Sequence, residues 1–111
     1  REIIAKNNLA LNAKNNLAWI LATDPDDAIR DAKSALKLSE EVNQKTGHKN
    51  FATLDTLAAA QAENGQFAEA VKTINKAIKS ARAAGKLQIV DKLLQKAVIY
   101  SSKNPYRSSN K

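Results

Sequence analysis

The chain has 111 residues, of which 43% are hydrophobic and 26% charged, and its formal net charge is +7. A chain of this length buries roughly two thirds of the surface that it exposes when unfolded, which suffices for one domain but not for two. Cysteine is absent, which excludes a disulfide framework and a thiolate metal site. No apolar run reaches the roughly 18 residues that cross a bilayer, so no membrane span is expected in this fragment.

The first eight residues are expected to form the end of a preceding helical repeat, with a break at Asn7-Asn8. The chain opens on Arg1, contains no methionine, and begins with a sequence typical of a last helical turn. We therefore expect a piece of a longer protein, whose open N-terminal end would also offer a surface for self-association.

Residues 9–46 are predicted to form a first pair of helices. The first covers about 9–22 and places Leu17 and Leu21 on its inner face. Asp24-Pro25 is expected to start the second helix, because proline fits the first helical position and acidic residues favour the positive end of the helix dipole.

The second helix of this pair is expected to run to about Gln44. Thr46-Gly47 then ends it, because glycine adopts the left-handed conformation that commonly follows a helix. Residues 50–84 repeat the arrangement. Asn50 caps a helix over about 51–64, and Gly65 turns the chain into a helix over about 67–83.

After Gly85 a final amphipathic helix is predicted over 86–102, and it covers the exposed end of the array. Its apolar stripe comprises Leu87, Val90, Leu93, Leu94, Ala97 and Val98. Residues 103–111 form a polar tail, in which Pro105-Tyr106 is expected to fold back.

The two helix pairs are copies of one pattern. Leu17-Ala18 and Leu57-Ala58 are 40 residues apart, whereas Ala32 and Ala70 are 38 apart, so the copies differ by a short insertion at the first turn. A two-helix unit that recurs at this spacing indicates a solenoid.

The second copy carries a recognisable signature: Leu57-Ala58, Gly65, Phe67, Ala70, Ile74 and Ala77-Ile78. It resembles the tetratricopeptide repeat (TPR) family, in a form seen in bacterial members that the segments 15–23, 53–60 and 104–107 also match. Gln61 and Ser39 depart from the family pattern. The resemblance implies an all-α, right-handed α-solenoid of antiparallel helix hairpins, with about two full repeats and a C-terminal capping helix.

The first helix of each pair has a face opposite its inner face. At about 100° per residue, Asp55 and Ala59 lie near 160° and 200° from Leu57, and Trp19 is the equivalent of Ala59. In the family this side lines a concave groove that receives peptides or partner helices. The resemblance therefore implies partner contacts at Asn12, Asn15, Trp19, Asp55, Ala59 and Ala62.

Two interpretations of Trp19 remain open. Its ring either packs between successive helices, filling the space above Ala59, or serves as a binding anchor, since tryptophan is frequent in interface hot spots.

Charge is unevenly distributed along the chain. Residues 1–71 hold eight basic and ten acidic residues, a net charge of −2, whereas residues 72–111 hold ten basic residues and one acidic residue, a net charge of +9. A basic strip comprises Lys72, Lys76, Lys79, Arg82 and Lys86. It is either a solvated outer face or a surface for nucleic acid or an anionic membrane, although aromatic residues that would stack on bases are missing from it.

The sequence gives little indication of catalysis. The single histidine, His48, has no nearby carboxylate pair, and the three glycines form no phosphate-binding loop. We expect no enzyme, metal or cofactor, but a scaffold that binds a protein or peptide partner in the groove. The alternatives are electrostatic binding through the basic C-terminal half and service as an accessory C-terminal array of a larger enzyme or membrane protein.

Overall fold

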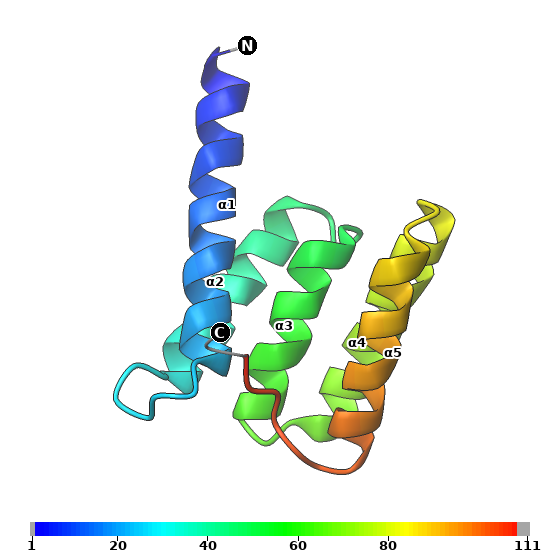
Figure 1. Ribbon diagram of the computed structural model, residues 1–111. Helices are drawn as coiled ribbons and strands as arrows, with labels where there is room; N and C mark the ends of the chain where they lie inside the picture. The colour runs from blue at the N-terminus through cyan, green and yellow to red at the C-terminus, as the bar shows by residue number, and fades with distance from the viewer. Residues whose placement is uncertain (1, 109–111) are drawn as a thin grey trace.

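The computed structural model describes residues 2–108, with side chains from residue 9 onward. This part of the chain is all-α, with five helices and no strand. The helices are α1 (Glu2–Thr23), α2 (Ala32–Lys45), α3 (Phe51–Glu63), α4 (Phe67–Ala83) and α5 (Leu87–Ser101) (Figure 1). The predicted helices over 51–64, 67–83 and 86–102 are thus confirmed to within one residue.

Some predictions concern residues at the chain ends. Those for Arg1 and for residues 109–111 of the tail lie outside the described residues. Over the described range, no helix combines the length and the apolar composition that a bilayer crossing requires.

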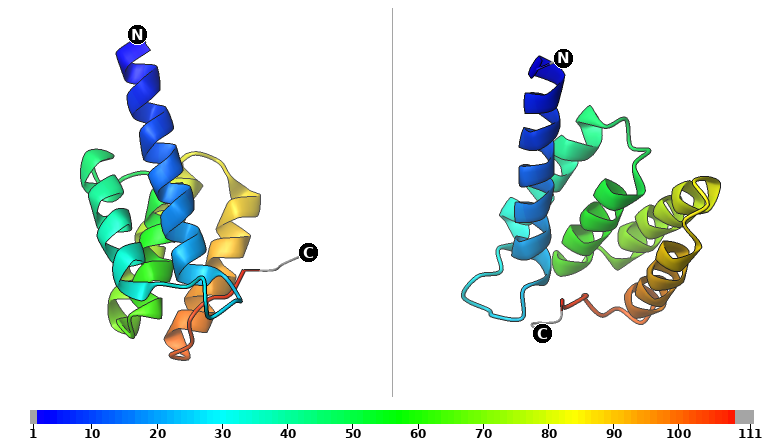
Figure 2. Two further views of the ribbon diagram at one scale, coloured as in Figure 1. Left: turned by 90° about the vertical axis from the view of Figure 1, so that its left-hand side faces the viewer. Right: turned by 45° about the horizontal axis from the view of Figure 1, so that its top comes forward.

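α1 runs without interruption through Asn7-Asn8, so the predicted break is wrong. Asparagine costs a helix at most about 0.7 kcal/mol relative to alanine, and no glycine or proline occurs before Pro25. Residues 2–8 therefore continue the same helix as residues 9–23. Figure 2 shows the first turns of α1 extending beyond the neighbouring helices.

α2 begins at Ala32 rather than at Asp24-Pro25, and residues 24–31 form a loop. The carboxylates of Asp24 and Asp26 each accept a hydrogen bond from the backbone N–H two residues further on, at 2.8 and 2.9 Å. Aspartate favours such turns because its carboxylate competes for backbone donors. The helix starts only after Asp31, which has extended backbone and caps it by accepting the N–H three residues on.

Three helices end at glycine in the same hydrogen-bonded motif. After α3, Gly65 has a φ of 78°, its N–H donates to the Ala62 carbonyl at 3.0 Å, and the next N–H donates to the Gln61 carbonyl at 2.8 Å. Side chains are strained at this φ, which explains the glycine. Gly47 and Gly85 end α2 and α4 in the same way, as predicted.

Successive helices pack against one another, and α1 also contacts α3. The main core lies between α3, α4 and α5. Its largest fully buried side chains are Leu54, Ile74, Leu93 and Tyr100. Alanines at Ala58, Ala70, Ala77 and Ala81 are fully buried between them. Such small residues let the helices approach closely.

On α1 and α5, the buried face differs from the inner face that the sequence predicts. On α1, Leu17 is 47% exposed, and Ala18 and Ala22 are buried in its place, because alanine permits the close approach of neighbouring helices. On α5 the buried residues are Val90, Leu93 and Tyr100, whereas Leu87, Leu94 and Val98 of the predicted stripe are exposed. Tyr100 has the largest side chain of α5, and burying its ring sets which face of the helix turns inward.

The Tyr100 hydroxyl gives a test of this packing. It is buried without a hydrogen-bond partner among the described residues, and burial raises the pKa of the phenol. Tyr100→Phe keeps the ring and removes an unpaired polar atom, so we expect the free energy of unfolding to stay unchanged or to rise by about 1 kcal/mol. Urea unfolding followed by circular dichroism measures the change. A clear loss of stability would mean that the hydroxyl has a partner.

Candidate functional site

Trp19 of α1 and Asp55 of α3 lie on the same face of the protein. The sequence predicts that both face one groove, from the first helices of successive pairs. Both contact Lys96 of α5. Asn12 of α1 is exposed, and Asn15 is half-buried with its side-chain oxygen enclosed and unpaired. We call the surface where α1, α3, α5 and residues 103–108 meet the tail-binding face.

Ala59 and Ala62 do not form the exposed floor that the sequence predicts. They are 1% and 2% exposed, because α3 is a central helix that packs against α1, α2 and α4. Ala59 belongs to a small core cluster with alanines of α1 and α2, and Trp19 packs against this cluster. Trp19 therefore packs against neighbouring helices, and the same ring also contacts Tyr106 of the tail, so its role as a binding anchor stays a prediction.

Lys96 is the centre of the tail-binding face. Its ammonium nitrogen lies 2.8 Å from Oδ2 and 3.1 Å from Oδ1 of Asp55. The same nitrogen lies 4.5 Å from the ring centroid of Trp19 and 4.8 Å from that of Tyr106. Only 12% of the Lys96 side chain and 20% of the Asp55 side chain are exposed. A desolvated ammonium over an aromatic face gains about 2 kcal/mol, so the two rings and the carboxylate share the stabilisation of one cation.

The tail turns back onto this face immediately after α5. Lys103 has a φ of 62°, and the N–H groups of Lys103 and Asn104 donate to carbonyls of the last turn of α5 at 2.9 and 3.1 Å. This is the motif found at the three glycines, with lysine in the left-handed position. It reverses the chain and sends the tail past the end of α3 towards α1 (Figure 1).

Several contacts hold the tail in place, in addition to the position of the Lys96 ammonium over Tyr106. The rings of Tyr106 and Trp19 are 5.6 Å apart between centroids and inclined at 44°. Arg107 Nη1 donates to Oε1 of Glu63 at 2.7 Å. The backbone N–H of Ser108 donates to the Thr23 carbonyl at 2.9 Å. The expectation that Pro105-Tyr106 folds back is therefore confirmed.

Glu63 joins the tail to the first loop. Its other carboxylate oxygen accepts from Arg30 Nε at 3.2 Å, and both side chains are 14% exposed. Arg30 also donates to the carbonyl of Asp24 at 2.7 Å and pairs with the Asp27 carboxylate. The acidic loop between α1 and α2 is thus part of the network that holds the tail.

A pocket of about 380 Å³ lies beside the tail, between α5 and Tyr106, and Lys92, Gln95 and Lys96 line it. The residues of the predicted basic strip, Lys72, Lys76, Lys79, Arg82 and Lys86, are all exposed on α4 and the turn after it.

In the described part of the chain, no group of three histidine, aspartate or glutamate residues could hold a metal ion.

Two important residues of this face are absent from the predicted contacts. Lys96 follows Leu93 by three residues and precedes Tyr100 by four, so its spacing already places it on the buried side of α5. A lysine on the buried side of a helix needs a partner for its charge, so this spacing is a sequence signal for a paired Lys96. Tyr106 could be placed in a folded-back tail, but its partner Trp19 could not.

Comparisons with protein-family models, with curated protein sequences and with solved structures find no match to this chain.

Lys96→Met tests the central ion pair. It keeps the aliphatic stem but leaves the partly buried Asp55 carboxylate without its ammonium, so we expect the free energy of unfolding to fall by about 2 kcal/mol. Lys92→Met, at an exposed lysine one turn earlier, is the matched control and should change it by less than about 0.5 kcal/mol. Urea unfolding followed by circular dichroism and by the fluorescence of Trp19, the single tryptophan, measures both. Equal losses for the two variants would contradict a structural role of Lys96.

The titration of Asp55 gives a second test. Burial raises the pKa of this carboxyl group, and the Lys96 ammonium opposes the rise. The folded protein then binds the proton more tightly than the unfolded chain, where the pKa of aspartate is about 3.9. The stability that Asp55 contributes is therefore fully present below that value and decreases as the pH rises through the folded-state pKa.

Asp55→Asn removes the titrating group and supplies the reference. The free energy of unfolding of the wild type minus that of the variant should decrease with rising pH in this window. Urea unfolding at a series of pH values measures the difference. A difference that grows with pH would show that the ion pair outweighs burial.

Proposed function

We propose that this chain is a non-catalytic protein-interaction scaffold of the TPR type, which binds an extended segment of a partner protein on the tail-binding face. One observation supports the proposal most directly. The face already holds a segment without regular secondary structure, residues 104–108 of the chain itself, through side-chain and main-chain contacts.

The contacts of the tail indicate which chemical groups a partner segment needs in order to bind this face. An aromatic ring packs at a tilt against Trp19, the following arginine pairs with Glu63, and a main-chain N–H donates to the Thr23 carbonyl. Aromatic and arginine side chains are also the ones enriched at interface hot spots. A segment with an aromatic residue followed by arginine therefore fits this face.

The tail also sets the affinity that a partner must reach. A segment tethered by a short flexible linker has an effective concentration in the millimolar range, so a free segment of equal intrinsic affinity displaces it only at comparable concentration. A partner that binds at lower concentration must make additional contacts. The pocket beside Tyr106, lined by Lys92, Gln95 and Lys96, offers polar groups for such contacts.

The repeated helix pairs support a scaffold of the TPR type. Two pairs are followed by a single helix, and α1 packs against α3 as the first helices of successive repeats do in a solenoid. In solenoids each repeat contacts its neighbours, and ligands bind along the shared surface.

A competition experiment tests the proposal in the full chain. Tyr106→Ala combined with Arg107→Ala removes the two side chains that hold the tail and changes no residue of the five helices. A fluorescent peptide with the sequence of residues 103–111 should bind this variant about tenfold or more tighter than it binds the wild type, because the competing tail is released. Fluorescence anisotropy measures both affinities.

Two further variants make the result specific. Adding Trp19→Ala to the released variant should abolish binding, whereas adding Lys33→Ala on the far surface of α2 should not. Selection of a random peptide library on the released variant should then enrich segments with an aromatic residue followed by arginine. Absence of peptide binding, or binding that persists without Trp19, would contradict the proposed site.

A further inference from the structure

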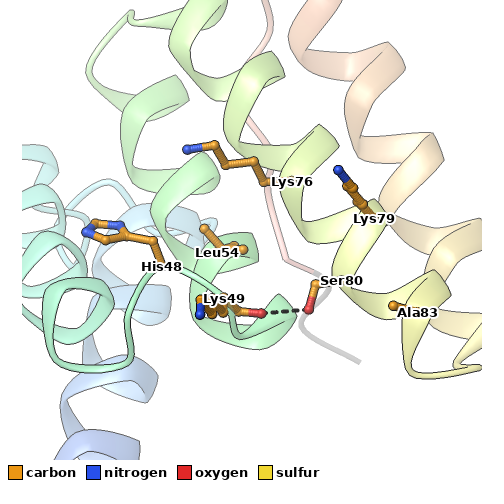
Figure 3. A pocket seen from close by; sticks show the side chains of 7 residues that line it. All are labelled: His48, Lys49, Leu54, Lys76, Lys79, Ser80 and Ala83. Atoms are coloured by element: carbon orange, nitrogen blue, oxygen red, sulfur yellow. Dashed lines mark hydrogen bonds between the residues drawn. The ribbon is translucent and has the colours of Figure 1, made fainter.

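A second pocket lies away from the tail-binding face, between the α2–α3 loop and the C-terminal half of α4. Its volume is about 340 Å³, within the range of small-molecule sites. Four basic residues line it: His48, Lys49, Lys76 and Lys79. In Figure 3 they surround Leu54, whose side chain lies in the middle of the group.

The basic side chains of this pocket lack acidic partners. The lining contains no aspartate or glutamate. Among the described side chains, the ion pairs of the protein involve other lysines and arginines, and none includes Lys49, Lys76 or Lys79. Three ammonium groups around one concave surface repel one another, and a bound anion would relieve that repulsion.

The loop that carries His48 and Lys49 is fixed in place. Gly47 and His48 both have left-handed backbone, with φ of 74° and 57°. This conformation is uncommon for a residue with a side chain. The His48 N–H donates to the Asn43 carbonyl at 2.9 Å, and the Ser80 hydroxyl donates to the Lys49 carbonyl at 2.7 Å. The second bond, drawn in Figure 3, ties the loop to α4, so the basic side chains come from a constrained frame.

The pocket also has an apolar part. Its apolar surface comes from the exposed Ala83 and the aliphatic stems of the lysines, since Leu54, although it borders the pocket, is only 2% exposed. An inorganic anion would use only the charged rim. A ligand that uses the whole pocket carries negative charge at one end and an apolar group at the other.

We propose that this pocket binds a phosphate monoester that carries a small apolar group, with the phosphate between Lys76, Lys79 and His48 and the apolar group against Ala83 and the aliphatic stems of the lysines. Ammonium groups and an imidazole N–H donate to phosphate oxygens, and such charge-assisted hydrogen bonds are the stronger ones. Nucleic acid fits less well, because no phenylalanine, tyrosine or tryptophan lines the pocket to stack on bases.

The test is a titration of the full chain with phenyl phosphate and with inorganic phosphate, followed by amide chemical shifts in NMR spectra. Saturable shifts are expected at Lys49 and Ser80, with phenyl phosphate binding more tightly. Lys76→Gln with Lys79→Gln should weaken phenyl phosphate binding about tenfold or more. Lys72→Gln with Lys86→Gln removes the same charge from the basic strip outside the pocket and should weaken it less than about threefold.

Ala83→Phe distinguishes the contribution of the apolar group of the ligand from that of its phosphate. It fills the apolar part and leaves every charge in place, so it should weaken phenyl phosphate binding and leave inorganic phosphate binding unchanged. Equal losses in the two lysine pairs would overturn the proposal in favour of diffuse attraction by the strip. Shifts that do not saturate at millimolar ligand, or that fall outside the pocket, would also overturn it. These outcomes are independent of the tail-binding face, which none of the variants touches.

Discussion

One partly buried cation connects the parts of this protein. The Lys96 ammonium needs compensation for the water that it loses, and it receives this from the Asp55 carboxylate and from the rings of Trp19 and Tyr106. These four groups come from α5, α3, α1 and the tail. The pairing of this lysine therefore links α5 and the tail to α1 and α3, in addition to the core that Leu93 and Tyr100 of α5 form with α3 and α4.

The same arrangement gives the proposed function its physical basis. A face that holds a segment through one contact between tilted aromatic rings, an arginine pair and one main-chain hydrogen bond is specific but not strong, since each contact contributes about 1 kcal/mol or a little more. Such a segment can exchange with a better one. The basic pocket on α4 lies elsewhere and uses different chemistry, so the two surfaces would act separately.

Much of the fold follows from local sequence signals. Asn50 caps α3, and Gly47, Gly65 and Gly85 end three helices, because these effects depend on a residue and its close neighbours. Residues 24–31 form a loop, although the sequence predicts that a helix starts at Asp24-Pro25. Aspartates that suit a helix start also accept hydrogen bonds from nearby backbone N–H groups in turns.

The features that could not be predicted from the sequence depend on contacts between residues that are far apart along the chain. Periodicity on α5 admits two adjacent faces, and the burial of Tyr100 selects between them. Trp19 and Asp55 could be placed on a shared face, but the buried state of Ala59 follows from α3 having neighbours on several sides. The pairing of Lys96 with Asp55 spans 41 residues, and no local pattern identifies it.

The most direct test of this account is a nuclear Overhauser experiment on the unmodified protein. The ring centroids of Trp19 and Tyr106 are 5.6 Å apart, and the Lys96 ammonium lies over both rings. The account predicts cross-peaks between the two rings, and side-chain signals of Lys96 shifted upfield by ring currents. Tyr106 signals at random-coil positions, without cross-peaks to Trp19, would contradict the docked tail and the role given to Lys96.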